Sequence, residues 1–213
     1  MSGHGERSRV ALTFDMEHPS RGDQRPDAPA RLLDTLSVTH TRASFFVQGR
    51  WARSHPALAR RVVDEGHLLG SHSHFHAPLP FLSDDGVRAD LASSAQALEQ
   101  VTGADPRPWF RCPFGAGHDD PRILGLLREA GYRNVHWNVD PADWEVGRAP
   151  DEVVDSVVAG VREVGDGAIV LLHTWPAATP QAVPTLIERL AADGASFVGV
   201  DELVDAVLPG SRG

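Results

Sequence analysis

The chain has 213 residues, 41% of them hydrophobic and 23% charged, and a formal net charge of -9. This composition is typical of a globular protein with one sizeable core, so we expect a single domain over residues 1–213. The negative charge, without any run of basic residues, argues against binding to nucleic acid or to an anionic membrane surface.

Cysteine content and hydropathy indicate the cellular compartment in which the protein is expected. Cys112 is the one cysteine, so no intrachain disulfide can form, which fits a reducing compartment. Residues 1–7 are polar and lack the apolar region of a secretory signal. No apolar window is long enough for a transmembrane helix. We therefore expect a cytoplasmic protein.

In chain order, short apolar runs alternate with segments of helical periodicity. The runs that read as strands are 9–14, 43–47, 66–71, 108–111, 133–140, 168–172 and 196–200. The segments that read as helices are 29–38, 55–65, 83–98, 119–131, 151–164 and 179–192. Ser83 and either Asp119 or Asp120 are placed to cap two of these helices. Such alternation favours a parallel α/β fold.

Several expected strands end in a polar residue that can carry chemistry. These residues are Asp15, His72, Arg111, Asp140 and His173. In a barrel of parallel strands the active site lies at the carboxyl ends of the strands, whereas an open sheet binds mostly at one switch point. Residues spread over five strands converge more easily in a barrel, which we therefore expect.

His72 and His76 stand four positions apart after the third strand. If the chain coils there, both imidazoles fall on one face and can meet one metal ion. The chain holds eleven histidines, and an isolated pair of this kind is more often two surface residues. Further motifs have to decide between these interpretations.

Five motifs in order resemble those of the polysaccharide deacetylases of the NodB-homology type, carbohydrate esterase family 4. They are Thr13-Phe14-Asp15, His72-Ser73-His74-Phe75-His76, Arg111-Cys112-Pro113-Phe114-Gly115, Asp140-Pro141-Ala142-Asp143-Trp144 and Leu171-Leu172-His173. The resemblance implies a distorted (β/α) barrel of seven or eight parallel strands. It also implies a hydrolase acting on carbon–nitrogen bonds other than peptide bonds, which removes an N-acetyl or related acyl group.

The resemblance makes His72 and His76 ligands of a divalent ion, most simply Zn²⁺, with Co²⁺, Ni²⁺ or Mn²⁺ as alternatives. The family usually has two adjacent aspartates, a base and a third ligand, but here Met16 follows Asp15. A thioether is a poor substitute for a carboxylate beside two imidazoles. Residues 15 and 17 share a face in an extended segment, so we hypothesise that Glu17 is the third ligand. Asp15 and His18 remain alternatives.

The same resemblance implies the catalytic roles. Asp15 matches the base and Arg111 the arginine that pairs with it. His173 matches the general acid, and Asp143 the aspartate that orients this histidine and raises its pKa. The backbone N–H of Phe114 matches an oxyanion donor.

Four further residues admit an ordinary structural interpretation. Trp144 and Leu171 match walls of the substrate pocket, although core positions explain them equally well. Asp140 could support the site or cap its loop. Cys112 is expected to be inert, because a catalytic thiol needs a paired histidine.

The substrate is the least determined feature. The family's best-known substrates are N-acetylglucosamine polymers outside the cytoplasm, so an amino sugar conjugate and a small N-acylated metabolite both stay open. Two other functions compete: hydrolysis of a cyclic amide or imide, as in allantoinase-like relatives, and carbohydrate binding on a degenerate deacetylase scaffold. The presence of Asp15, Arg111, Asp143 and His173 together favours an active enzyme.

Overall fold

The structure is a computed structural model that describes residues 8–18 and 25–207, with side chains as far as residue 203. Residues 1–7, which bear on the expectation of no leader, lie outside the described residues. Within the described chain, no helix combines the length and the apolar character that crossing a bilayer requires.

The described strands form one parallel sheet in the order β5-β4-β3-β2-β1-β6, with β7 paired to the start of β1. Their bounds are β1 Arg9–Met16, β2 Ser44–Val47, β3 Leu68–Ser71, β4 Trp109–Phe110, β5 Arg133–Asn134, β6 Ala168–His173 and β7 Ser196–Phe197. Because all the pairings are parallel, the carboxyl ends of the strands lie at one edge of the sheet.

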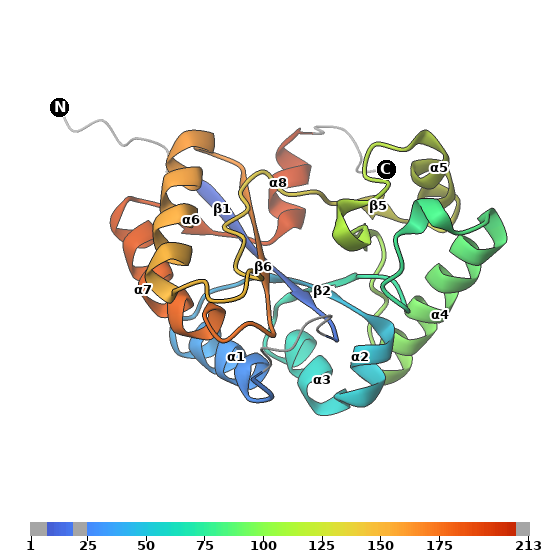
Figure 1. The fold of residues 1–213 in the computed structure, drawn as a ribbon, viewed down its shortest axis with the longest axis horizontal. Helices are drawn as coiled ribbons and strands as arrows, with labels where there is room; N and C mark the ends of the chain where they lie inside the picture. Colours follow the sequence, from blue (N-terminus) through green and yellow to red (C-terminus); the bar gives the residue numbers. More distant parts are fainter. Residues whose placement is uncertain (1–7, 19–24, 208–213) are drawn as a thin grey trace.

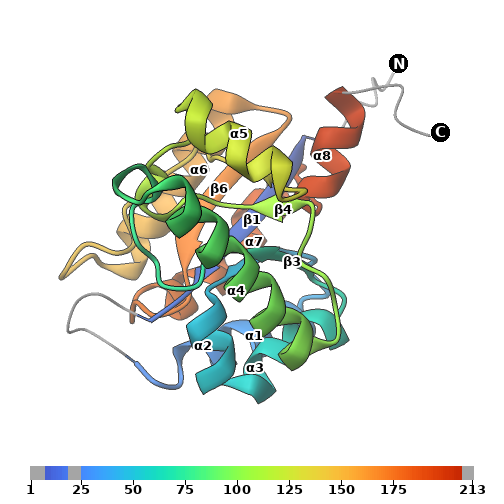
Figure 2. The same cartoon turned by 90° about the vertical axis from the view of Figure 1, so that its right-hand side faces the viewer.

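Helices surround the sheet from outside (Figures 1 and 2). They are α1 Ala28–Val38, α2 Gly49–Ser54, α3 Pro56–Asp64, α4 Asp84–Thr102, α5 Pro121–Glu129, α6 Pro150–Val164, α7 Thr179–Ala192 and α8 Val200–Val207. Two 3₁₀ turns, Leu79–Phe81 and Pro113–Gly115, lie in the connections. The arrangement is a curled, parallel (β/α) half-barrel, which confirms the predicted fold class.

Strand β1 shows how the sequence divides core from site. Leu12, Phe14 and Met16 belong to the main hydrophobic cluster, which also includes residues of α1, α6 and α7. Alternate residues of a strand face opposite sides, so Thr13 and Asp15 point into the barrel. The alternation buries Leu12, Phe14 and Met16 under the helices and places Asp15 on the inner face, where a separate apolar cluster around Ala11 and Phe46 also lies.

The predicted helix starts at Ser83 and Asp120 are confirmed. The Ser83 hydroxyl accepts the N–H of Gly86 at 3.2 Å, and the Asp120 carboxylate accepts the N–H of Arg122 at 2.8 Å. Of the two aspartates considered for the second cap, the structure therefore selects Asp120.

Three of the expected strands span only two residues each. β4 spans two residues because Pro108 and Pro113, which lack an N–H, flank it, and its partner β5 is equally short. The expected strand 133–140 therefore ends early, and only Val139 forms a further bridge, to Val170 of β6. The strand predicted at 196–200 stops at Phe197, because α8 begins at Val200.

The spacing of His72 and His76 places them on one face of a helix only if the chain coils after β3. In the structure this segment is not helical. It is a turn in which Ser73 and His76 both have φ of 60°. A separate helix, α2, also precedes α3 and was not predicted. The histidine pair therefore meets through a strained turn rather than through a helix face.

Candidate active site

The register of the parallel strands places the expected site residues at the carboxyl edge of the sheet. Asp15 of β1 is paired with Phe46 of β2 and with His173 of β6. His72 directly follows β3, and Arg111 directly follows β4. The residues therefore converge at the carboxyl edge of the sheet, as predicted.

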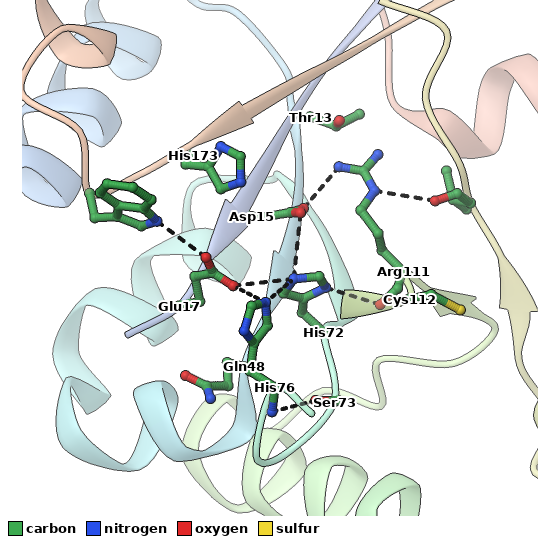
Figure 3. Close-up of polar contacts among 12 residues, drawn as sticks. Thr13, Asp15, Glu17, Gln48, His72, Ser73, His76, Arg111, Cys112 and His173 are labelled. Atoms are coloured by element: carbon green, nitrogen blue, oxygen red, sulfur yellow. Dashed lines mark hydrogen bonds and ion pairs between the residues drawn. The ribbon is translucent and has the colours of Figure 1, made fainter. Parts of the chain in front are cut away.

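Met16 and Glu17 point to opposite sides. Met16 is fully buried in the main hydrophobic cluster, whereas the carboxylate of Glu17 faces His72 and His76 (Figure 3). A metal-binding side chain at position 16 would therefore lie on the helix side of the sheet. The geometry agrees with the hypothesis that Glu17 supplies the carboxylate.

Glu17, His72 and His76 form a cluster that suits a metal ion. One ligand atom from each residue lies within 4.8 Å of the others, and no other such group exists among the described residues. The Glu17 Oε2 atom is 3.3 Å from His72 Nε2, and it also contacts His76 Nε2. That oxygen is buried. Two imidazoles and one carboxylate are a donor set that Zn²⁺ accepts, so the residues fit the implied ion.

The surroundings fix the protonation of these ligands. His72 Nδ1 lies 3.0 Å from the carbonyl oxygen of Arg111, so it carries the proton and leaves Nε2 as a ligand atom. Burial raises the pKa of Glu17, but hydrogen bonds and charge from His72 and His76 outweigh burial and hold that pKa well below its ordinary value. Glu17 is therefore an ionised carboxylate.

Asp15 lies between Arg111 and His72. The buried guanidinium of Arg111 donates to Asp15 Oδ1 at 2.9 Å, and Asp15 Oδ2 is 3.5 Å from His72 Nε2. The Arg111 side chain packs 4.1 Å from the ring centre of Phe46 and donates from Nε to the carbonyl of Val135. Asp15 is thus held by an arginine and keeps one oxygen toward the histidines.

His173 and Asp143 form a tight pair. Asp143 Oδ1 is 2.8 Å from His173 Nδ1, and its Oδ2 accepts the backbone N–H of His173 at 2.8 Å. The hydroxyl of Thr179 donates to the same Oδ2 at 2.6 Å. Burial lowers the pKa of His173, but the charge of Asp143 and its hydrogen bond outweigh burial and raise that pKa to about 9. His173 therefore carries a proton at neutral pH.

These groups open into a pocket of about 340 Å³. Its lining contains the three predicted substrate-contacting residues, Phe114, Trp144 and Leu171. Trp137 and Trp175 also line it, and neither was singled out from the sequence. The pocket joins the carboxylate and histidine cluster to His173 across an apolar wall, an arrangement suited to hydrolysis of an acyl group.

Residues 2–135 match the family model for polysaccharide deacetylases. The chain belongs to this family. The match confirms the family inferred from the motifs and, with it, an enzyme that hydrolyses carbon–nitrogen bonds.

Two curated relatives of this deacetylase are each 34% identical to it. A peptidoglycan-N-acetylglucosamine deacetylase of Listeria monocytogenes aligns over 92% of the chain, which spans only 38% of that protein. A chitooligosaccharide deacetylase of Rhizobium leguminosarum aligns over 81% of the chain and 74% of its own length.

Solved structures agree with the fold of the deacetylase. A structure titled as T48 deacetylase with substrate has a TM-score of 0.79 at 34% identity and covers 94% of this chain and 92% of its own. A carbohydrate esterase family 4 pseudoenzyme from Bacillus anthracis has a TM-score of 0.81 at 28% identity, covering 95% of this chain and 67% of its own. A mutant of that pseudoenzyme is described as having restored activity.

Two residues that support the deacetylase site were not found from the sequence. Trp175 donates from Nε1 to Glu17 Oε1 at 3.2 Å, and Asp90 of α4 accepts the N–H groups of His74 and Phe75. Burial raises the pKa of Asp90, against the effect of these N–H donors. Neither residue lies in a recognised motif, so only the proximity created by folding reveals them.

Three loops at the site are held in uncommon backbone conformations. Ser73, His76, Phe114 and Ala142 have φ between 53° and 60° without being glycine. Such conformations persist only where the surroundings enforce them, and they cluster at functional sites. The Ser73 hydroxyl, which accepts the N–H of His76 at 2.8 Å, helps to enforce this turn.

The remaining candidates lie outside the described ligand cluster. His18 is absent from it and lies instead beside His55, with ring centres 5.8 Å apart. Asp140 lines the pocket and accepts the N–H of Ala142 at 2.8 Å, so it caps its loop. Burial raises the pKa of the Cys112 thiol to about 12, which keeps it protonated.

Proposed function

We propose that this deacetylase removes the N-acetyl group from an amino-sugar unit of an oligosaccharide or of peptidoglycan, and that it depends on a divalent metal ion. The observation that carries the proposal is that Asp15, paired with Arg111, and His173, paired with Asp143, line one pocket together with the Glu17, His72 and His76 cluster. The names of the relatives support the substrate class.

Glu17, His72 and His76 would hold the ion. When bound, a divalent ion supplies Lewis acidity toward the acyl carbonyl and lowers the pKa of a water molecule. Asp15, whose Oδ1 is held by Arg111, accepts the proton of the attacking water at Oδ2. The Phe114 N–H donates to the oxygen that becomes negative. His173, with Nδ1 engaged by Asp143, delivers its proton from Nε2 to the leaving amine.

The shape of the surface supports a sugar oligomer over a small N-acylated metabolite. Phe75, Phe114 and Trp144 are all exposed near the pocket, at 58%, 62% and 37% respectively. Exposed aromatic side chains around a pocket are typical of a ligand-binding groove that continues beyond it. A metabolite that fits wholly inside the pocket would not reach Phe75, which lies outside the pocket lining.

The competing functions are less well supported. Cyclic amide hydrolysis has no specific observation in its favour. A purely binding protein would not need the buried Asp15–Arg111 and His173–Asp143 pairs, which are costly to bury unless they are used or fully compensated. A single domain over residues 1–213 and a cytoplasmic location both stay predictions.

The direct test is release of acetate from chitooligosaccharides and from peptidoglycan fragments. The protein should be prepared with Zn²⁺ or Co²⁺ and compared with a sample treated with EDTA. We expect release with metal, loss of release after chelation and recovery when metal is returned. A metal-loaded, folded protein that releases acetate from neither substrate class would contradict the proposal.

A further inference from the structure

A second hollow adjoins the active-site pocket. It has a volume of about 340 Å³ and is lined by His18, Gln48, Arg50, Phe75, His76 and Phe114. His76 and Phe114 line the pocket as well, and their ring centres are 4.4 Å apart. The two spaces therefore meet across this ring pair. Gln48 and His76, which both line the hollow, are labelled in Figure 3.

The hollow differs from the pocket in charge. The pocket is lined by the carboxylates of Asp15, Glu17 and Asp140 and by no arginine. The hollow is lined by Arg50 and by no carboxylate. Of these two spaces, the hollow is therefore the one in which an anionic group on the substrate would meet an arginine.

Arg50 is available for such a group. All 20 basic residues of the chain are arginine, and most of those described are paired with a carboxylate. No carboxylate among the described residues forms an ion pair with Arg50. Its guanidinium instead lies 5.8 Å from the ring centre of exposed Phe75, which leaves the N–H donors at its edge for a ligand.

Hydrogen bonds hold the backbone around the hollow in place. The Arg50 N–H donates to the carbonyl of His74 at 3.4 Å, and the neighbouring Gly49 N–H donates to the carbonyl of Ser73 at 2.9 Å. Gln48 Oε1 accepts the N–H of His18 at 3.0 Å. These bonds tie the start of α2 to the turn that carries His76, so Arg50 has a fixed position relative to the active site.

We propose that this hollow binds the saccharide unit joined to the one that loses its acetyl group, and that Arg50 selects a carboxylate on that neighbouring unit. The inference rests on the proposed deacetylation and goes beyond it, because it favours an acidic glycan, such as one containing muramic acid, over neutral chitooligosaccharides. Arg50 thereby becomes a specificity-determining residue outside the catalytic groups.

The test compares one oligosaccharide in two forms, with its muramic carboxylate free and with that carboxylate converted to an amide. The metal-loaded wild-type protein should show a KM that is lower for the acid by roughly two- to fivefold, the range for an exposed ion pair, at similar kcat. The Arg50→Gln variant should lose this preference, and Arg50→Lys should keep part of it. On a neutral chitooligosaccharide, the change in KM caused by either variant should be smaller than the change on the acid.

Arg53→Gln is the matched control, since Arg53 is exposed on the same helix, lies outside the hollow and carries the same charge. An acid preference that survives Arg50→Gln, or that Arg53→Gln removes equally, would overturn the inference. Calorimetric binding of both forms to the His173→Ala protein separates the two proposals. Absence of turnover in the wild type refutes the deacetylation, whereas equal binding of acid and amide refutes the role of Arg50.

Discussion

The active site has two halves that the fold builds in different ways. The half with Glu17, His72 and Arg111 comes from the ends of β1, β3 and β4, and its side chains are at most 4% exposed. The half with His173 depends on Asp143, which reaches it from the connection between β5 and α6. Register alone places the first half, whereas the second combines His173, which register also places, with a loop residue that holds it through two hydrogen bonds.

This difference separates two properties of the enzyme. Changes in the strand-end half should alter metal content, because its side chains converge on one point. Changes in the loop half should alter turnover and its pH dependence while metal content stays the same. Each variant described below changes a residue in one half of the site. The property that depends on the other half then serves as an internal control.

The largest expected effect is that of Glu17→Ala. Loss of the one carboxylate in the cluster should lower metal affinity by more than roughly a hundredfold, beyond the usual effect of changing a supporting residue. Metal analysis after dialysis measures this directly. Met16→Leu, a change of similar volume in the core, is the matched control and should keep its metal.

The double variant Met16→Asp with Glu17→Ala tests whether a carboxylate at position 16 can replace the one at position 17. Because position 16 faces the hydrophobic cluster, we expect destabilisation without recovery of metal. Recovery of metal and activity would show that a carboxylate at position 16 can reach the histidines and that the orientation assigned to Glu17 is wrong.

Replacement of the proton donor should give the next largest effect. His173→Ala should lower kcat by roughly 10²- to 10⁴-fold, the usual contribution of a positioned acid, with unchanged metal content. Steady-state kinetics and metal analysis on the same preparation test both halves together. Unaltered turnover would remove His173 from the reaction.

Asp143→Asn should change the pH dependence of kcat and of Tm. The pKa of His173 is raised to about 9 from an ordinary 6.5, so its proton is retained across this interval. Without the carboxylate charge, the alkaline fall in kcat should move toward lower pH. The pair stabilises the fold fully below pH 6.5 and loses this contribution as the pH rises through 9. The difference in Tm between wild type and variant should narrow over that interval, and a constant difference would contradict the linkage.

The smallest predicted effect is that of Trp175→Phe. The indole N–H orients Glu17, so its loss should weaken metal binding by roughly tenfold, as for other residues that support a ligand. Titration with a competing chelator measures this change. Trp144→Phe, on the loop half, is the control and should leave metal affinity unchanged.

The sequence by itself determined much of this protein. The alternation of elements predicted the parallel barrel, and the strand-end residues Asp15, His72, Arg111 and His173 predicted the edge at which they meet. These inferences succeed because the two-residue period of a strand and the parallel direction of the strands are local properties that fix where side chains point.

Only the tertiary structure decided the rest. Local pattern could not show that Asp90 lies near the site, since α4 brings it there, or that Trp175, two residues after His173, turns its indole toward Glu17. It also could not show that His72 and His76 meet through a strained turn, which surrounding hydrogen bonds enforce. Which of Asp15, Glu17 and His18 contacts both His72 and His76 likewise depends on the direction of β1 relative to β3, a relation between strands that no single segment contains.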